Sequence, residues 1–330
     1  MDITNIIEKI KRTIDTHNLG EEGAYARFLR QNKNNDRKMG INEYGCADAA
    51  NILYTINEFI REPEKREQWI EKLRSFQNRE TGIFEEPTHH FIHTTAHCIA
   101  ALELFDAYPE YPVTALEKYK RKEELYGLLD NLDWENFPWP QSHQGAGIYA
   151  VMTLTGAADA EWRKWYFDWL WENADPQTGF WKKGIEKKAP LYTYMGGGFH
   201  YFFNLENGKM PVRYPEKIID SCIEMYENNE TCSRFGKMIG FLEVDWAYCI
   251  NRASRQTEYK FRECKEILRK FSKGFIEYLN DVNEKEDDEF NDLHMLFGAV
   301  CALAELQSAL PGEILSPKPL RLVLDRRPFI

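Results

Sequence analysis

Four of the eight histidines in this 330-residue chain stand in PTHHFIHTTAH, residues 87–97, at the start of an apolar run. Imidazole titrates near neutral pH, so grouped histidines can exchange protons with a substrate, bind its hydroxyls or hold a metal ion. His93 and His97 are four residues apart and therefore share one face of a helix. That spacing suits two metal ligands, or one cavity histidine beside one buried, hydrogen-bonded histidine, and we favour the second interpretation.

The metal interpretation lacks further support in the sequence. No HExxH or CxxC motif is present, and no third ligand is fixed by its spacing from His93 and His97. We therefore expect no metal ion and no other cofactor.

Three aspartates are candidates for the acid and base of a hydrolase. Asp245 lies in the apolar stretch GFLEVDWAYCI, where an unpaired carboxylate is costly, so it either faces a cavity or pairs with Arg252 or Arg255. A carboxyl group in an apolar wall keeps its proton and can donate it to a leaving group, while a second carboxylate activates water. We assign the acid role to Asp245 and the base role to Asp48 or Asp292. Asp292 could equally be only a helix cap.

The other candidates are polar or aromatic side chains near the starts of the same apolar segments. His143, in PWPQSHQGAG, and His294 are assigned to acid–base catalysis, whereas His89 is expected to be an ordinary loop residue. The expected substrate-binding residues are Tyr44, His90, His93, His97, Trp139, Gln144, Tyr194, His200 and Trp246.

Six segments that are apolar on nearly every side must position these residues. They begin at intervals of roughly 50 residues, a period typical of stacked or circular two-helix units. A helix that is hydrophobic on all sides is buried on all sides. The six segments are 44–56, 93–105, 142–156, 194–206, 241–253 and 291–307.

Six amphipathic segments alternate with the apolar ones, each with one apolar stripe and one charged face, as in surface helices. They are 3–18, 66–77, 114–132, 159–174, 215–228 and 259–279. This alternation predicts an all-α fold, an (α/α)6 toroid of six inner and six outer helices. We expect a single domain over residues 1–330, with 311–330 as an extended C-terminal tail.

The longer connections all lead from an outer helix into an inner one, which places them on one face of the ring. Seven of the eight histidines fall in those connections or in the helical turns that follow them. Loops carried on one face of a rigid scaffold commonly carry function. The sequence therefore predicts a central pocket at the starts of the inner helices.

Composition excludes several classes of function. The net charge of −11 and pI near 5.4 argue against binding to nucleic-acid phosphates or to anionic membranes. No apolar run has the length of a membrane span. Seven scattered cysteines suggest reduced thiols, so we expect a cytoplasmic protein.

Two stretches resemble known families. Residues 75–105, SFQNRETGIFEEPTHHFIHTTAHCIAALELF, resemble a repeat of the terpenoid cyclase and protein prenyltransferase superfamily in their glutamine, glycine-aromatic turn and alanine-rich helix. DPQTGFWKKG, residues 175–184, is similar to six-hairpin glycosidases, including unsaturated glucuronyl hydrolases. Both groups are α/α toroids, and the glycosidase resemblance implies carboxylates at inner-helix starts, which Asp48, Asp245 and Asp292 could supply.

These observations favour a carbohydrate-active enzyme, a glycoside hydrolase with a carboxylate pair in a histidine-lined pocket, acting on a small saccharide. One alternative is a sugar epimerase or lyase in which His93, His143 or His294 exchanges a proton beside a carbonyl. Another is a terpenoid cyclase or prenyltransferase, although the DxDD acid motif of the cyclases is absent. A toroid that binds a ligand without catalysis is the last alternative.

Overall fold

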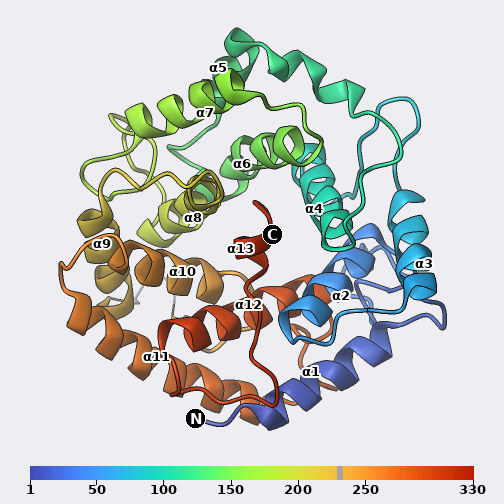
Figure 1. Ribbon diagram of the computed structural model, residues 1–330. Helices are drawn as coiled ribbons and strands as arrows, with labels where there is room; N and C mark the ends of the chain where they lie inside the picture. The colour runs from blue at the N-terminus through green and yellow to red at the C-terminus, as the bar shows by residue number, and fades with distance from the viewer. Residues whose placement is uncertain (229–232) are drawn as a thin grey trace.

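The computed structural model describes residues 1–228 and 233–330, and this part of the chain is all-helical. Within these ranges the only β pairing consists of isolated bridges, such as that between Asp2 and Leu315. One set of helices lies around the centre of the molecule and a second set lies outside it, whereas the short helix α13 (Val323–Arg326) lies inside the inner set (Figure 1). The inner helices are α2 (Glu43–Thr55), α4 (Phe91–Leu104), α6 (Pro138–Leu154), α8 (Leu191–Asn207), α10 (Leu242–Ser254) and α12 (Leu293–Ala309).

The outer helices surround this group. They are α1 (Thr4–His17), α3 (Pro63–Arg74), α5 (Lys122–Asn131), α7 (Ala160–Asn173), α9 (Pro215–Glu227) and α11 (Phe261–Asp281). Each inner helix packs against the next inner helix along the chain, and α12 packs against α2. The six inner helices therefore form a closed cycle of neighbours.

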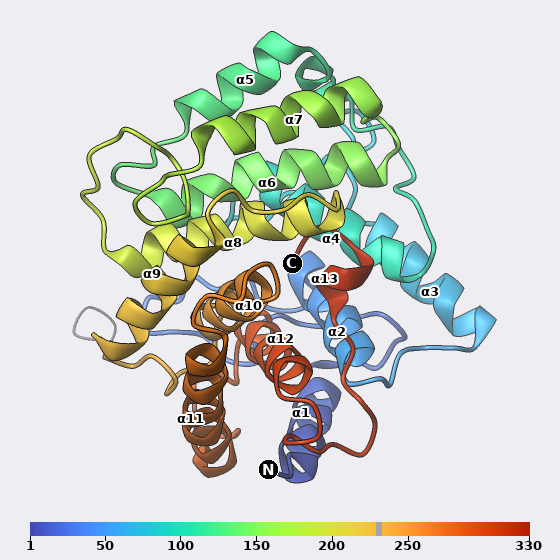
Figure 2. The same ribbon diagram turned by 60° about the vertical axis from the view of Figure 1, so that its left-hand side comes forward.

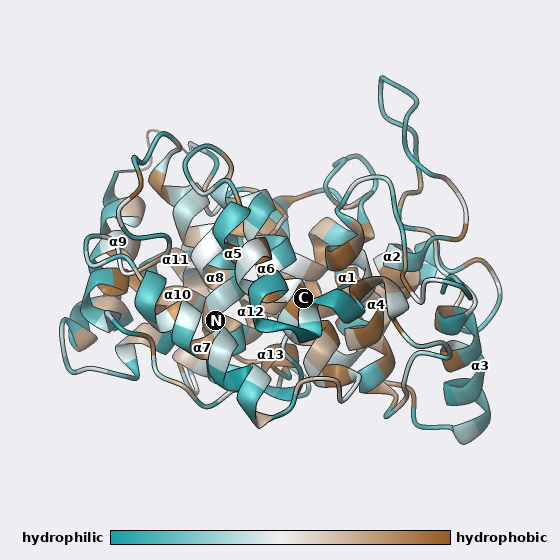
Figure 3. Ribbon diagram, turned by 90° about the horizontal axis from the view of Figure 1, so that it is seen from above, coloured by the Kyte–Doolittle hydropathy of each residue, from teal (hydrophilic) through white to brown (hydrophobic). Residues whose placement is uncertain are grey.

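Burial follows the sequence pattern. On α12 nearly every residue is buried, whereas α11 buries one stripe that includes Ile267, Phe271 and Phe275. Seen from above, the surface helix α3 is largely hydrophilic in colour, and long loops extend past the helix ends (Figure 3). Within the described part of the chain, no helix combines the length and hydropathy needed to cross a membrane.

The glycines of MGGGFH allow close approach between neighbouring elements. A Cβ at Gly197 would lie 2.9 Å from the carbonyl oxygen of Pro138, and one at Gly198 would lie 2.3 Å from a ring atom of Phe180. Tight packing thus explains glycine here, although glycine disfavours a helix by about 1 kcal/mol relative to alanine.

Two segments differ from the sequence-based expectation. Residues 114–132, predicted as one helix, divide into a 3-10 helix (Thr114–Lys120) and α5, because Arg121 between them has extended backbone angles. The tail is not extended throughout: Val323–Arg326 forms the short helix α13. Arg326 there bonds Glu103 at 3.1 Å and Asp106 at 2.7 Å, at the carboxyl end of α4.

The end of the tail lies inside the ring of inner helices (Figures 1 and 2). Phe329 and Ile330 are buried there, and the ring of Phe329 lies 5.1 Å from that of His93. The tail therefore fills the axis on the side of the inner helices' carboxyl ends.

Candidate functional site

A cavity of about 120 Å³ lies at the axis, on the side of the inner helices' N-termini. It is lined by Arg27, His89, His93, Trp139, His143, His200, Phe241, His294, Met295 and Ile330. Five of these ten residues are histidines and none is an aspartate or glutamate. Polar groups converging in an enclosed hollow mark this cavity as the candidate site.

Four imidazoles form a continuous row along the cavity wall. The distance between ring centres is 4.6 Å from His89 to His93, 4.3 Å from His93 to His143 and 4.4 Å from His143 to His200. His93 is in the first turn of α4, whereas His143 and His200 come from α6 and α8. Three inner helices thus bring together residues that are far apart in sequence.

Burial keeps three of these imidazoles, those of His93, His143 and His200, uncharged. Burial, reinforced by repulsion from neighbouring histidines, lowers the pKa of both His93 and His143 well below the usual value. Burial lowers the pKa of His200 to about 3. At neutral pH each ring therefore carries one N–H donor and one nitrogen that can accept a proton.

Two hydroxyl groups bond imidazoles of this row, one at His93 and one at His200. Tyr44 Oη lies 2.6 Å from His93 Nδ1. Ser142 Oγ donates to the carbonyl oxygen of Trp139 at 2.7 Å and lies 2.8 Å from His200 Nδ1. Since the serine hydroxyl has one proton, it accepts from His200 Nδ1–H, which leaves Nε2 of His200 as the accepting nitrogen.

Asp48, which does not line the cavity, bonds two further imidazoles, those of His97 and of the lining residue His294. Its Oδ1 lies 2.8 Å from His97 Nε2 and 3.1 Å from His294 Nδ1, and all three side chains are buried. Burial alone would raise the pKa of Asp48, but the interactions with His294 and His97 outweigh it and hold that pKa well below its usual range. Thus His93 lines the cavity while His97, one turn later, is a buried histidine bonded to a carboxylate.

Asp292 holds the start of α12 in place. It accepts a hydrogen bond from the backbone N–H of His294 at 3.0 Å, and its two oxygens accept from Arg27 at 2.9 and 3.1 Å. Arg27 also donates to Thr88 and lies 3.7 Å from Glu86. Both oxygens of Asp292 are therefore engaged in a cap and an ion pair, and Asp292 does not line the cavity.

Asp245 also lies outside the cavity. It is fully buried, and neither carboxylate oxygen has a hydrogen-bond partner among the described residues. Of its two expected partners, Arg252 bonds Glu305 at 2.9 Å and Arg255 bonds Ser308 at 3.0 Å. Burial raises the pKa of Asp245 well above the usual value, so the group is a protonated acid away from the cavity.

Four expected binding residues have structural partners and do not line the cavity. His90 caps α4 by accepting from the backbone N–H of Ile92. Gln144 bonds Gln141, Tyr194 donates to the Glu135 carbonyl, and Trp246 donates to the Cys222 carbonyl. The structure brings together Tyr44, Asp48, His93, His97, Trp139, His143, His200 and His294.

Five lining residues were missing from the sequence-based site: Arg27, His89, Phe241, Met295 and Ile330. The only available signal was the position of His89 beside the other histidines. Its ring stacks on that of Tyr44, with 4.8 Å between the ring centres. No local sequence pattern indicates this contact.

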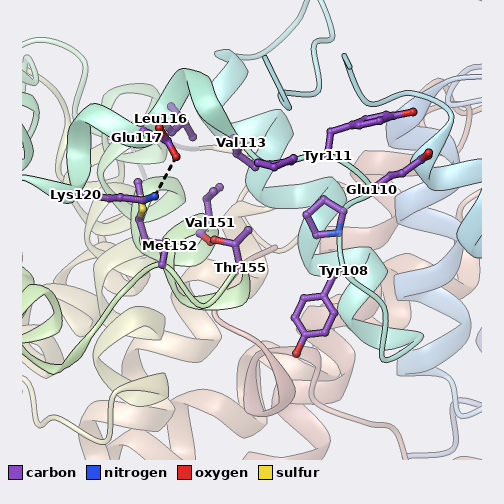
Figure 4. A pocket seen from close by; sticks show the side chains of 13 residues that line it. Tyr108, Glu110, Tyr111, Val113, Leu116, Glu117, Lys120, Val151, Met152 and Thr155 are labelled. Atoms are coloured by element: carbon purple, nitrogen blue, oxygen red, sulfur yellow. Dashed lines mark hydrogen bonds and ion pairs between the residues drawn. The ribbon is translucent and has the colours of Figure 1, made fainter. Parts of the chain in front are cut away.

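A second hollow, of about 380 Å³, lies between the chain around residues 108–120 and the end of α6 (Figure 4). Tyr108, Val113 and Met152 contribute to its wall, together with a Glu117–Lys120 ion pair of 3.2 Å. No histidine, cysteine or aspartate lines it. This second hollow, although larger than the axial cavity, therefore lacks the cluster of histidines that lines the axial cavity.

Comparison with known proteins adds no relative: no protein-family model matches the chain, and no curated protein or solved structure is significantly similar to it.

Proposed function

We propose that this chain is an (α/α)6 toroid enzyme that moves protons between histidines and a small polar substrate. The reaction class is epimerisation or elimination beside a carbonyl group, and the substrate class is a monosaccharide or a uronic acid derivative. The observation that carries the proposal is the row of four imidazoles along the axial cavity. The closed cycle of inner helices supports the toroid assignment.

The residues that line the cavity favour acid–base catalysis by histidine over catalysis by a pair of carboxyl groups. A glycosidase of the usual kind needs two carboxyl groups flanking the substrate. Neither Asp245 nor Asp292 lines the cavity, and Asp48 lies behind His97 and His294. An isoprenoid cyclase needs a wall of aromatic rings, whereas Trp139 and Phe241 are the only non-histidine aromatics of this one.

The residues suit the steps of a proton transfer. A neutral imidazole can take a proton from a carbon beside a carbonyl, and the imidazolium that results can pass its proton to a neighbouring imidazole of the row. The neighbour then returns the proton to the carbon or to a leaving group, so both rings are neutral again. His200 is the best-defined acceptor, because Ser142 engages its Nδ1–H. Trp139 at the wall offers a flat face for a sugar ring.

Cavity size limits the substrate. A volume of about 120 Å³ is below the roughly 300–1,000 Å³ of sites for drug-sized ligands. We therefore expect one sugar unit or a smaller molecule, rather than a stretch of polysaccharide, to reach the histidines.

Solvent deuterium exchange tests the proposal directly. The protein would be incubated in D₂O with a panel of reducing monosaccharides, uronic acids and unsaturated uronosides, and deuterium on carbon followed by NMR. We expect incorporation for at least one substrate, and a loss of about 10²–10⁴-fold in His143→Gln and His200→Gln, because a positioned acid or base contributes that much.

The matched control is His90→Asn, which changes a histidine of the same cluster that does not line the cavity and keeps a capping side chain. This variant should retain the wild-type rate. If no compound exchanges, or if His90→Asn is as inactive as His143→Gln, the proton-transfer proposal is wrong.

A further inference from the structure

Asp48, His97 and His294 come from three inner helices that are neighbours in the ring, α2, α4 and α12. One possible ligand atom from each lies within 4.8 Å of the others. Among the residues that the structure describes, this is the one such group of three. The contacts to Asp48 are 2.8 Å from His97 Nε2, and 3.1 and 3.2 Å from His294 Nδ1.

Two imidazoles and a carboxylate are the ligand types of zinc and of related divalent transition metals. In tetrahedral zinc sites with bonds of about 2.0–2.1 Å, neighbouring ligand atoms are about 3.3 Å apart. The observed separations from Asp48 are 0.1–0.5 Å shorter than that edge, so small shifts of the side chains would bring the Asp48 contacts to it. His97 Nδ1 is buried and lacks a partner in the described ranges, so hydrogen bonding leaves this group incompletely satisfied.

Charge also favours a cation at this point. Asp48 is fully buried, and its only ion-pair partners within the described residues are the two histidines. The nearby guanidinium of Arg27 is engaged by Asp292 and Glu86 instead. The buried guanidinium of Arg327 adds a positive charge near Asp48 and His97, but within the described residues it forms no ion pair with Asp48. A divalent ion bound by Asp48 itself would compensate the buried carboxylate directly.

We propose that Asp48, His97 and His294 form a binding site for one divalent transition-metal ion, with zinc the best match. Three protein ligands leave a fourth position, as in catalytic zinc sites, and His294 also lines the cavity from which that position would be reached. The sequence favoured a metal-free site because His93 and His97 had no third ligand at a fixed spacing; Asp48 provides one from another helix. The proposal does not depend on the proton-transfer function.

The test is metal binding without any substrate. Protein treated with a chelator would be titrated with Zn²⁺ by calorimetry and with Co²⁺ by visible absorption, and the bound metal counted by elemental analysis. We expect one equivalent to bind. His97→Gln and Asp48→Asn should lose more than about 100-fold in affinity, since even changes in the groups behind the ligands cost 10–100-fold.

The matched control is His200→Gln, which removes an equally enclosed histidine of the same cavity wall and should still bind one equivalent. NMR of ¹⁵N-labelled histidines in the wild type needs no variant: Zn²⁺ should shift the His97 and His294 resonances and leave His200 unchanged. Absence of saturable binding, or equal binding by His97→Gln, would overturn the proposal, whatever the deuterium-exchange screen shows.

Discussion

Two acids on α10 are buried with unsatisfied carboxylate oxygens. Glu243 accepts one hydrogen bond, from the backbone N–H of Gly236 at 3.0 Å, and its second oxygen has no partner within the described ranges. Burial raises the pKa of Glu243 to about 8. For Asp245, two residues later, neither carboxylate oxygen has a hydrogen-bond partner among the described residues. Both acids therefore keep a proton in the folded state that they release when the chain unfolds.

This difference makes stability depend on pH in a known direction. Below the unfolded pKa of Glu243, near 4.5, both states hold the proton and no penalty arises. As pH rises from about 5 to 8, only the unfolded chain releases it, so the folded state loses stability. Glu243→Gln removes this penalty, and its stability relative to wild type should rise by up to a few kcal/mol across that interval, at about 1.4 kcal/mol per pKa unit.

Urea unfolding at pH 5, 6.5 and 8 measures this effect. Glu277→Gln, at an exposed position of α11, is the control and should track the wild type at all three values. A Glu243→Gln variant whose advantage is the same at pH 5 and pH 8 would contradict the buried-acid explanation.

Ser142 determines the proton position on His200. Because its hydroxyl accepts from Nδ1–H, the wild-type imidazole is the Nδ1–H tautomer. Ser142→Ala removes the acceptor, and the ring should redistribute between its two neutral tautomers. The ¹⁵N chemical shifts of His200 report this directly, and unchanged shifts in Ser142→Ala would show that another group fixes the ring.

At the scale of helices, glycines distinguish tight contacts from open surface. A Cβ on Gly298 of α12 would lie 2.4 Å from the backbone oxygen of Gly240, whereas one on Gly274 of α11 meets nothing within 4 Å. Gly298→Ala should therefore destabilise the protein by about 1–3 kcal/mol through overpacking. Gly274→Ala should stabilise it by about 0.5–1 kcal/mol through helix propensity. Thermal and urea unfolding of the two variants measure whether each substitution lowers or raises stability as expected. If Gly298→Ala leaves stability unchanged, α12 can move away from Gly240.

The helices were largely predictable because each has a continuous pattern of its own. Burial on all sides identified α4 and α12, and α7 begins directly after Asp159, whose side chain accepts from the backbone N–H of Trp162. The break at Arg121 was not predictable, because the charged stretch around it reads as helix on both sides. The turn at Val323–Arg326 depends on ion pairs with a distant helix and has no local signal.

The site was less predictable than the helices. A periodic pattern indicates that His93, His143 and His294 begin inner helices, but not which way each ring points. Arg27 reaches Asp292 across 265 residues of sequence, and no spacing rule encodes that ion pair. Asp245 shows the opposite failure: a carboxyl in an apolar helix suggested a cavity, yet its side chain is buried in the protein interior.

At the scale of the whole molecule, the C-terminal tail contributes buried side chains to the core. Phe329 is fully buried and contacts the rings of His93 and Phe203, at 5.1 and 5.9 Å between ring centres. Phe329→Ala should cost about 3–5 kcal/mol and enlarge the axial cavity. Urea unfolding measures the loss, with Leu315→Ala, at a 56% exposed position, as the control. Equal stability of the two variants would mean that the tail is not docked in solution.

Because Phe329 and Ile330 block the far end of the axis, the ring is a dead-end chamber and not a tunnel. A polymer cannot thread through it and can offer only a terminal unit. Under the proposed function, product must leave the cavity by the same opening through which substrate enters. Product should then compete with substrate for the empty cavity, so accumulated product should slow turnover.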